Sequence, residues 1–344
     1  MKKKLMATML VLAMAVTSVA GCGNKNATVT TDDGKEVVTL NLSVPDPDSS
    51  YIYAAAQEFA KRAKEYSAGT LDITISANGS LYGGDASAGI KQLSAGGLDI
   101  VILSTSLYAS FNPEFNVISV PFMFDDQAQL TEYLNSEPGS QLLNSMESSK
   151  IKTVGKWTRS FRKITNSKLP ITQPGDLAGI KLRVPNNTLY VEYFTAAGAT
   201  TTPMSFSEVY NALQLKTLDG QENPIDVPYS NKFNEVQKYI SATDHMADAW
   251  LVGINADKFV SLSQEQQDAI TKAGEEVQQW NVDYMAAEDE KALQFLLDNG
   301  MEYNELSDEN KNKFVEISKG LYPTFKQLVA NDELFDATTS FCNK

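Results

Sequence analysis

Residues 37–103 read VVTLNLSVPDPDSSYIYAAAQEFAKRAKEYSAGTLDITISANGSLYGGDASAGIKQLSAGGLDIVIL, and the spacing of the apolar residues changes four times along them. Residues 38–44 alternate apolar and polar side chains, which predicts a strand, and residues 52–66 place their apolar side chains on one helical face. LDITIS at 71–76 alternates again, a helical stretch lies around 89–96, and DIVIL at 99–103 is typical of a buried strand. This alternation of strands and helices favours a mainly parallel sheet with helices on both faces.

The middle of the chain repeats this pattern. GIKLRVP at 179–185 predicts a strand with its apolar residues on one face and Arg183 on the other, followed by a helix that ends near Gly198 and a short strand that ends at Met204. Ser205 and Glu208 have the spacing of a capping box, which predicts the start of another helix. The sequence therefore predicts a second α/β unit.

The last third of the chain is predicted to be helical. Ser263 and Gln266 could form a capping box, and the helix that they begin continues to about Asn299, with Gly274 as its main weak point. At 1.5 Å per residue, such a helix is long enough to cross two lobes. A chain of this length also exceeds the usual size of a single hydrophobic core, which favours two lobes.

The first 22 residues, MKKKLMATMLVLAMAVTSVAGC, predict an extracytoplasmic protein. Lysines, a short apolar run and small residues are the parts of a signal peptide (1–21), and the apolar run is too short to span a bilayer comfortably. The cysteine follows small residues as in a bacterial lipobox, so we expect Cys22 to be lipidated; the alternative is an ordinary cleaved signal with a chance cysteine. Residues 22–36 would then form a flexible linker, and the one remaining thiol, Cys342, could form no intramolecular disulfide.

Composition argues against several classes of function. The formal net charge of −14 disfavours nucleic acid as a partner. A zinc site of His and Cys ligands cannot be built around His245, the only histidine, and no phosphate-binding or dinucleotide motif is present, so we expect no cofactor and no enzyme. A calcium site made of carboxylates and a glycosidase with paired carboxylates stay open. Trp157, Trp250 and Trp280 could line a ligand cavity or belong to the core.

Six motifs carry a resemblance to one family. They are FNPEFNVISVPFMFDD (111–126), SFRKITNSKLPI (160–171), DLAGIKLRVP (176–185), GATTTPMSFSEVYNALQ (198–214), LDGQENP (218–224) and NEVQKYISATDH (234–245). In content and order they resemble the substrate-binding proteins of TRAP transporters.

The resemblance implies a fold, a cargo and a partner. The fold would be a two-lobed α/β fold of the periplasmic-binding-protein type, with a hinge, crossing strands and a long C-terminal helix that spans both lobes. Lobe 1 would comprise residues 37–160 and 249–288, and lobe 2 residues 161–248 and 289–344. The protein would be a monomer that captures a small organic acid and delivers it to a TRAP membrane permease driven by an ion gradient. A receptor for an ATP-driven importer and, more remotely, an extracytoplasmic hydrolase are the alternatives.

The resemblance also implies a ligand site. Arg183, in the KLRVP strand, would clamp the ligand carboxylate with its planar fork; without the motif, an exposed strand-end charge or an internal ion pair would be the simpler role. Asn223 matches the asparagine that hydrogen-bonds the ligand carboxylate in the family, and turn capping is its alternative role. Arg162 matches a second arginine that contacts the ligand in part of the family, with the neighbouring Arg159 and Lys163 as competitors for that match. Loops of the first lobe would form the opposite wall and contribute Tyr51, Asp85 and Ser104. The first strand ends in a segment, 44–46, that departs from many family members, which leaves the identity of the acid open.

Overall fold

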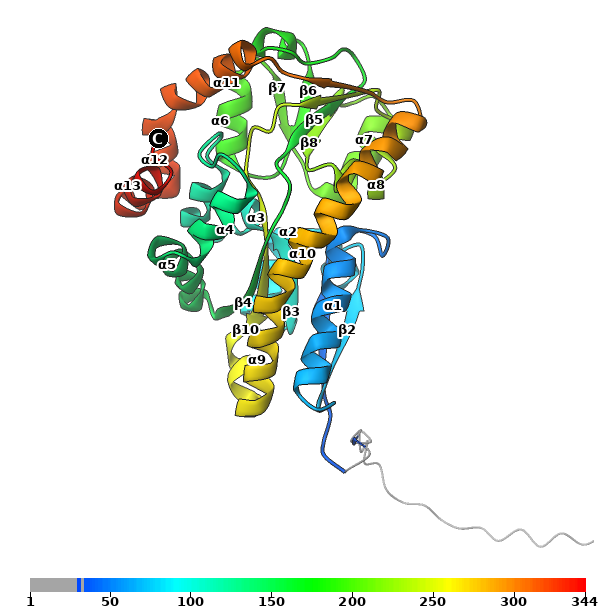
Figure 1. Cartoon of the computed structure of the whole chain (residues 1–344), viewed down its shortest axis with the longest axis vertical. Coiled ribbons are helices and arrows are strands. Elements are labelled where there is room, and N and C mark those ends of the chain that lie inside the picture. Colours follow the sequence, from blue (N-terminus) through cyan, green and yellow to red (C-terminus); the bar gives the residue numbers. More distant parts are fainter. Residues whose placement is uncertain (1–29, 32–33) are drawn as a thin grey trace, which may run out of the picture.

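The structure, a computed structural model, describes residues 30–31 and 34–344. The predicted signal peptide, the predicted lipidation site Cys22 and most of the predicted linker lie outside these residues. The described part contains two sheets, each with its own helices (Figure 1). We call the part built on the first sheet the first lobe and the part built on the second sheet the second lobe. The prediction of a two-lobed α/β fold is confirmed.

The first sheet has five strands in the order β2 (Leu71–Ser76), β1 (Val38–Ser43), β3 (Ile100–Ser104), β10 (Ala249–Asn255) and β4 (Ile151–Thr158). β1 runs parallel to β2 and β3, whereas β10 is antiparallel to both of its neighbours. Alternate residues of β3 enter different cores, because successive side chains of a strand point to opposite faces. Ile100 and Ile102 pack with α1 (Tyr51–Tyr66), while Val101 and Leu103 pack with α2 (Ala86–Ser94). Helices therefore cover both faces, as the sequence predicts.

The second sheet has six strands in the order β11 (Glu302–Glu305), β9 (Tyr239–Ala242), β5 (Lys163–Asn166), β8 (Gly220–Asn223), β6 (Lys181–Val184) and β7 (Thr200–Pro203). β6 is parallel to β7 and β8, and β5 is antiparallel to β8 and β9. The helices of this lobe include α6 (Thr188–Ala196), α7 (Phe206–Gln214) and α8 (Asp226–Ser230). The carboxyl ends of β6 and β8 lie side by side, which brings residues 183 and 223 to one edge of the sheet.

One of the two predicted capping boxes is wrong. Ser263 and Gln266 do form a capping box at the start of α10 (Gln264–Asp298). The side chain of Ser205 makes no capping hydrogen bond at α7, because the amide of Glu208 donates to the backbone oxygen of Ser205 at 3.1 Å instead. The helix begins there nevertheless, since water or backbone groups can satisfy its first amides.

The long helix α10 spans both lobes, as predicted. Its first half packs on β4 and α1, where Trp157 donates its indole N–H to the backbone oxygen of Gly274 at 2.8 Å. Its last turns pack with the second lobe, where Leu296 joins Ile225 and Ile240 in a small core. In Figure 1 the helix runs diagonally from the region of α9 (Ala256–Ser261) to the region of α7 and α8.

Two segments cross between the lobes beneath α10. Residues 159–162 connect β4 to β5, and residues 243–248 connect β9 to β10. Backbone hydrogen bonds join them: Arg159 N–H donates to Asp248 O at 2.9 Å, and Arg162 N–H donates to Met246 O at 3.1 Å. The predicted crossing strands are therefore present, and their polar side chains lie at the junction of the lobes.

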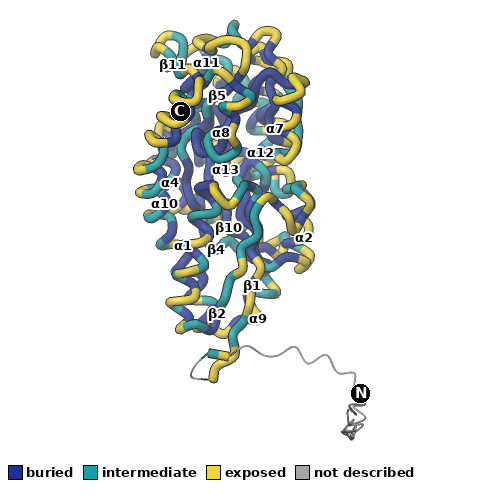
Figure 2. The backbone as a smooth tube through the Cα atoms, turned by 90° about the vertical axis from the view of Figure 1, so that its right-hand side faces the viewer, coloured by how far each residue is buried: buried dark blue, intermediate teal, exposed yellow. Residues whose placement is uncertain are grey.

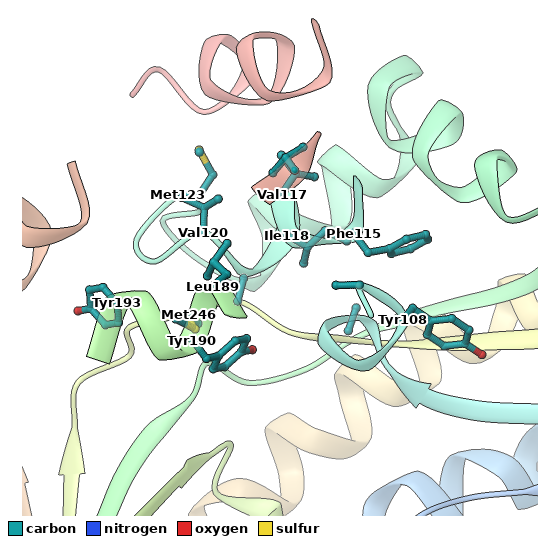
Figure 3. Close-up of a cluster of buried hydrophobic side chains, with 14 of the residues drawn as sticks. Tyr108, Phe115, Val117, Ile118, Val120, Met123, Leu189, Tyr190, Tyr193 and Met246 are labelled. Carbon is teal, nitrogen blue, oxygen red and sulfur yellow. The ribbon is translucent and has the colours of Figure 1, made fainter. Parts of the chain in front are cut away.

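A second junction is apolar. The segment η2 (Pro113–Ser119) packs with α6 and with the C-terminal helices α11 (Asp308–Gly320), α12 (Tyr322–Val329) and α13 (Asp332–Phe341), beside α4 (Gln127–Asn135) and α5 (Glu137–Ser145). Figure 3 shows Tyr108 of the first lobe and Tyr190 of the second within this one cluster. Buried residues run through both lobes, and exposed residues lie on outer turns (Figure 2). Since the C-terminal helices touch elements of both lobes, the assignment of sequence ranges to lobes stays a prediction.

No helix of residues 30–31 and 34–344 is both long and apolar enough to cross a membrane.

Candidate functional site

A cleft lies between the two lobes beside the crossing segments. It encloses about 450 Å³ between protein atoms, part of which is open to solvent. Both lobes contribute to its lining, which combines three arginines with one carboxylate, small polar side chains and apolar rings. The lining residues are Pro45, Asp46, Ser104, Ser106, Leu107, Arg159, Arg162, Arg183, Pro185, Phe206, Asn223, Val227 and Trp250.

Arg183 is a buried cation without an acidic partner. Its side chain comes from β6 and is only 3% exposed. Nε and Nη2 donate to the backbone oxygen of Met204 at 3.1 and 2.7 Å, and no described residue forms an ion pair with the guanidinium. Burial lowers the pKa of Arg183 to about 10, although the more distant Glu222 partly opposes this shift. The charge of Arg183 is thus available to an anion that enters the cleft.

Arg162, in contrast, is saturated with acceptors. Its Nη2 donates to Glu222 Oε1 at 2.9 Å and to Asn223 Oδ1 at 2.8 Å, and its Nη1 donates to Asp248 Oδ2 at 2.8 Å. Burial acts to lower the pKa of Arg162, but the adjacent Glu222 outweighs it, so the pKa lies well above its usual value. Arg162 therefore supports the floor of the cleft with its charge already balanced.

Arg159 is balanced in the same way. Its Nη2 donates to both carboxylate oxygens of Asp226 at 3.0 Å, and its Nη1 donates to Asp248 Oδ2 at 2.9 Å. The guanidinium also lies over the ring of Trp250, 4.5 Å from its centroid. Burial raises the pKa of Asp226 even beside Arg159, which shows how strongly this part of the molecule is desolvated.

Asn223 and Ser104 are held in place by this network. Asn223 Oδ1 accepts from Arg162, and its Nδ2 donates to Gln221 Oε1 at 2.6 Å, so the second N–H of the amide has no acceptor among the described residues. Ser104 Oγ donates to Asp248 Oδ1 at 2.6 Å and lies 2.8 Å from Ser106 Oγ. The neutral donors of the cleft are therefore fixed before any ligand binds.

The only histidine belongs to the far side of this network. His245 Nε2 lies 3.2 Å from Glu222 Oε2, and its Nδ1 lies 2.7 Å from Thr243 Oγ1. Burial lowers the pKa of His245, although Glu222 opposes this shift, so the ring is neutral at pH 7. In the part of the chain that the structure describes, no serine forms a hydrogen bond with the ring of His245. Among the described residues, no group of three or more His, Cys, Asp or Glu side chains could hold a metal ion.

The structure brings four of the six predicted ligand residues together. Arg183, Asn223, Arg162 and Ser104 all line the cleft.

The other two lie outside the lining. Tyr51 begins α1 and packs against the rings of Tyr229 and Tyr284, with centroid distances of 6.4 and 5.4 Å. Asp85 is the N-cap of α2, where its side chain accepts from two backbone amides. The ligand contacts assigned to all six residues stay a prediction.

Several lining residues were missing from the predicted site. Asp46 lies in the loop after β1 and Ser106 in the short helix α3 (Thr105–Tyr108), both in segments that the sequence placed on the first-lobe wall. Arg159 is three residues before Arg162 on the same crossing segment. Phe206 and Trp250 line the cleft beneath Arg183 and Arg159 respectively. Spacing could have signalled Arg159, but nothing local distinguishes the two rings from ordinary core residues.

Comparisons with known proteins agree with this geometry. A family profile described as "Bacterial extracellular solute-binding protein, family 7" matches residues 43–328. The chain is 34% identical to the 2,3-diketo-L-gulonate-binding periplasmic protein YiaO of Escherichia coli (strain K12), over 74% of this chain and 76% of the relative. It is 30% identical to the C4-dicarboxylate-binding protein DctB of Bacillus subtilis (strain 168), over 79% of this chain and 77% of the relative.

A solved structure agrees in fold as well. The sugar acid binding protein DctPAm of Advenella mimigardefordensis, crystallised with galactonate, is similar over 89% of this chain and 98% of that protein, with a TM-score of 0.85 and 30% identity. These relatives are named as binding proteins, so the prediction of a receptor rather than an enzyme is confirmed.

Proposed function

Because the chain belongs to family 7 of the bacterial extracellular solute-binding proteins, we propose that it captures a small organic acid in the cleft between its lobes and binds the carboxylate through Arg183. One observation carries this proposal. Of the three guanidinium groups that line the cleft, the described residues balance those of Arg159 and Arg162 with carboxylates and give that of Arg183 only a backbone carbonyl as hydrogen-bond acceptor. A ligand carboxylate supplies the missing charge and accepts charge-assisted hydrogen bonds.

Sugar acids are the favoured class of ligand. The E. coli relative and the similar solved structure are named for acids of this class, 2,3-diketo-L-gulonate and galactonate. The cleft suits such a ligand, because Ser104, Ser106 and Asn223 offer neutral hydrogen-bonding groups beside Arg183. Hydroxyl groups both donate and accept hydrogen bonds, so they match a wall of mixed polar side chains.

Binding would close the cleft. A ligand favours the closed form only if it contacts both lobes, and the lining residues come from both. Arg183 and Asn223 belong to the second lobe, and Ser104 and Asp46 to the first. The closed form would then dock on a TRAP permease, whose ion gradient drives import.

The anchor is a further part of the proposal. The segment VAGC at 19–22 supports lipidation of Cys22 after removal of residues 1–21. The test is to express the full chain and Cys22→Ala in bacteria and to separate membranes from the soluble fraction. The full chain is expected in the membrane fraction with a diacylglyceryl mass on its N-terminal peptide, and Cys22→Ala without it. An unmodified wild-type N-terminus after cleavage would contradict the anchor.

The ligand proposal is tested by thermal unfolding of the chain from Gly23 onward with a panel of acids that includes galactonate, galacturonate, 2,3-diketo-L-gulonate, pyruvate and succinate. A ligand at about 100 times its dissociation constant adds about 2.7 kcal/mol to the free energy of unfolding, which raises the midpoint visibly. We expect one acid class to raise the midpoint of the wild type and to leave that of Arg183→Ala unchanged. An equal rise in both proteins would contradict the clamp. The absence of any rise after unfolding and refolding, which removes copurified ligand, would contradict the function.

A further inference from the structure

The first-lobe wall of the cleft carries a carboxylate whose partners do not neutralise it. Asp46 follows β1, lines the cleft and is only 6% exposed. Its Oδ1 accepts one long hydrogen bond, 3.3 Å from Nδ2 of Asn231 in the second lobe. No described residue donates a hydrogen bond to Oδ2. This oxygen is not fully enclosed by protein atoms, and because Asp46 lines the cleft, Oδ2 is accessible from it.

The backbone holds Asp46 at this position. Its carbonyl oxygen accepts from the amide of Asn78 at 2.9 Å, and the carbonyl oxygen of Val44 accepts from the amide of Gly79 at 2.8 Å. The loop after β1 is thus tied to the loop after β2 on both sides of Pro45. Asp46 is therefore a fixed part of the wall.

Among the described residues, no cation forms an ion pair with Asp46. Arg159 and Arg162 form ion pairs with Asp226, Asp248 and Glu222. The positive charge of Arg159 therefore offsets the negative charge of Asp46 only in part. Burial raises the pKa of Asp46 to about 6, Arg159 counteracts this shift, and Asp226 adds to it. Three guanidinium groups thus face four carboxylates before any ligand enters.

These observations set what a ligand can present to each wall. One carboxylate of the ligand finds Arg183 unpaired on the second lobe. Any group that reaches the first lobe meets Asp46 Oδ2, which accepts hydrogen bonds and carries negative charge at neutral pH. A hydroxyl group donates to that oxygen, whereas a second carboxylate has no proton to donate and is repelled.

We propose, on the basis of the proposed function, that Asp46 is a specificity-determining residue that selects polyhydroxy monocarboxylates and rejects acids with a second carboxylate. Relatives of this chain are named for both kinds of acid, a sugar acid and a C4-dicarboxylate. The charge at residue 46 decides between them for this protein.

A pair of ligands isolates this effect. Galactonate and galactarate share a six-carbon hydroxylated chain, but galactarate replaces the terminal hydroxymethyl group of galactonate with a second carboxylate. Isothermal titration calorimetry at pH 7.5 measures the dissociation constant of each acid with the wild type, Asp46→Asn and Asp48→Asn. The last variant is the matched control, because Asp48 is an exposed aspartate of the same loop that does not line the cleft.

The expected result is a change in preference. The wild type binds galactonate at least about tenfold more tightly than galactarate, because a charge repulsion at short range in a partly desolvated site has this size or more. Asp46→Asn reduces that preference at least about tenfold, chiefly by tighter binding of galactarate, and Asp48→Asn keeps the wild-type preference.

Two results would overturn the proposal while the organic-acid function stands. One is a wild type that binds galactarate as tightly as galactonate, a measurement that needs no variant. The other is an unchanged preference in Asp46→Asn. A wild type that binds none of the acids of the panel would overturn the function itself together with this proposal.

Discussion

Replacement of Arg183 by Met should make the unliganded protein more stable and at the same time abolish its response to ligand. The reason is that Arg183 is buried without a counter-charge, so folding removes water from a cation and returns only two hydrogen bonds to Met204. A pKa lowered from 12.5 to about 10 corresponds to about 3 kcal/mol of unfavourable free energy in the folded state, at about 1.36 kcal/mol per unit. The lost hydrogen bonds offset about 1 to 2 kcal/mol of this. We expect a net gain of about 1 to 2 kcal/mol in the free energy of unfolding.

The sign of this effect is independent of pH over the working range. The folded-state pKa of Arg183 is below its unfolded value, so the folded state disfavours the cation at every pH below about 10. Titration between pH 5 and 9 therefore leaves the penalty constant, and only a substitution reveals it.

Arg159→Met is the matched control. Arg159 is as buried as Arg183, at 3% exposure, but it pairs with Asp226 and Asp248. Its removal leaves buried carboxylates without their cation, which is expected to lower the free energy of unfolding by about 3 to 5 kcal/mol. Two substitutions of the same kind in one cleft should thus change stability in opposite directions.

Urea denaturation with and without a saturating acid measures both effects. The loss of a buried charge pair with the ligand is expected to weaken binding by about 2 to 5 kcal/mol, which is a factor of about 30 to several thousand. The reasoning would be refuted if Arg183→Met lowered the free energy of unfolding as much as Arg159→Met, or if it kept the stabilisation by ligand.

Three further substitutions test other parts of the structure. Asp289→Asn should raise the free energy of unfolding above pH 6 and flatten its pH dependence between about pH 4 and 6. Burial raises the pKa of Asp289 to about 6, so an ionised Asp289 destabilises the fold above that pH. Urea denaturation across this range checks the prediction, and a fall in stability at pH 8 would contradict it. Gly84→Val should weaken ligand binding at least about tenfold relative to Gly83→Val. Both glycines have positive φ, but a Cβ only at Gly84 would lie 2.9 Å from Ser207, which belongs to the other lobe. Equal affinities in calorimetry would argue against contact between Gly84 and Ser207 in the closed form. Gly274→Ala should lower the free energy of unfolding by about 2 kcal/mol or more, since the Cβ of the new alanine would lie 1.7 Å from a backbone oxygen of β4. An unchanged thermal midpoint would show that α10 moves away from β4 without penalty.

The parts of the fold that depend on neighbouring residues were predictable from the sequence. The period of β1 and α1 and the capping box at Ser263 and Gln266 are local patterns, and the structure has them. The predicted capping box at Ser205 is absent, which shows the limit of local patterns. Spacing permits the hydrogen bond, but the conformation of the side chain decides whether it forms.

The charge balance of the site was not predictable in the same way. The position of Arg183 follows from a strand pattern and a family motif, but its lack of a partner depends on where every other charge lies. Arg159 and Arg162 find partners at Asp226 and Asp248, which are 60 or more residues away in the sequence. A chain with 43 acidic residues offers many candidate partners, so only the structure separates the balanced arginines from the unbalanced one.

The balanced network and the unbalanced arginine serve different ends in one cleft. Arg159 and Arg162 lie on a crossing segment, and their shared partner Asp248 lies on the other, so the network ties together the two strands at the junction of the lobes. Such a pair of cations contributes rigidity there but little attraction for an anion, because its charge is already neutralised. Arg183 lies away from the junction, at the end of a strand in one lobe, and an acid bound there would relieve its penalty of burial. Under the proposed function, a ligand would therefore stabilise this protein through a charge that the fold leaves uncompensated, and an acid whose remaining groups suit Asp46 on the opposite wall would hold the lobes together.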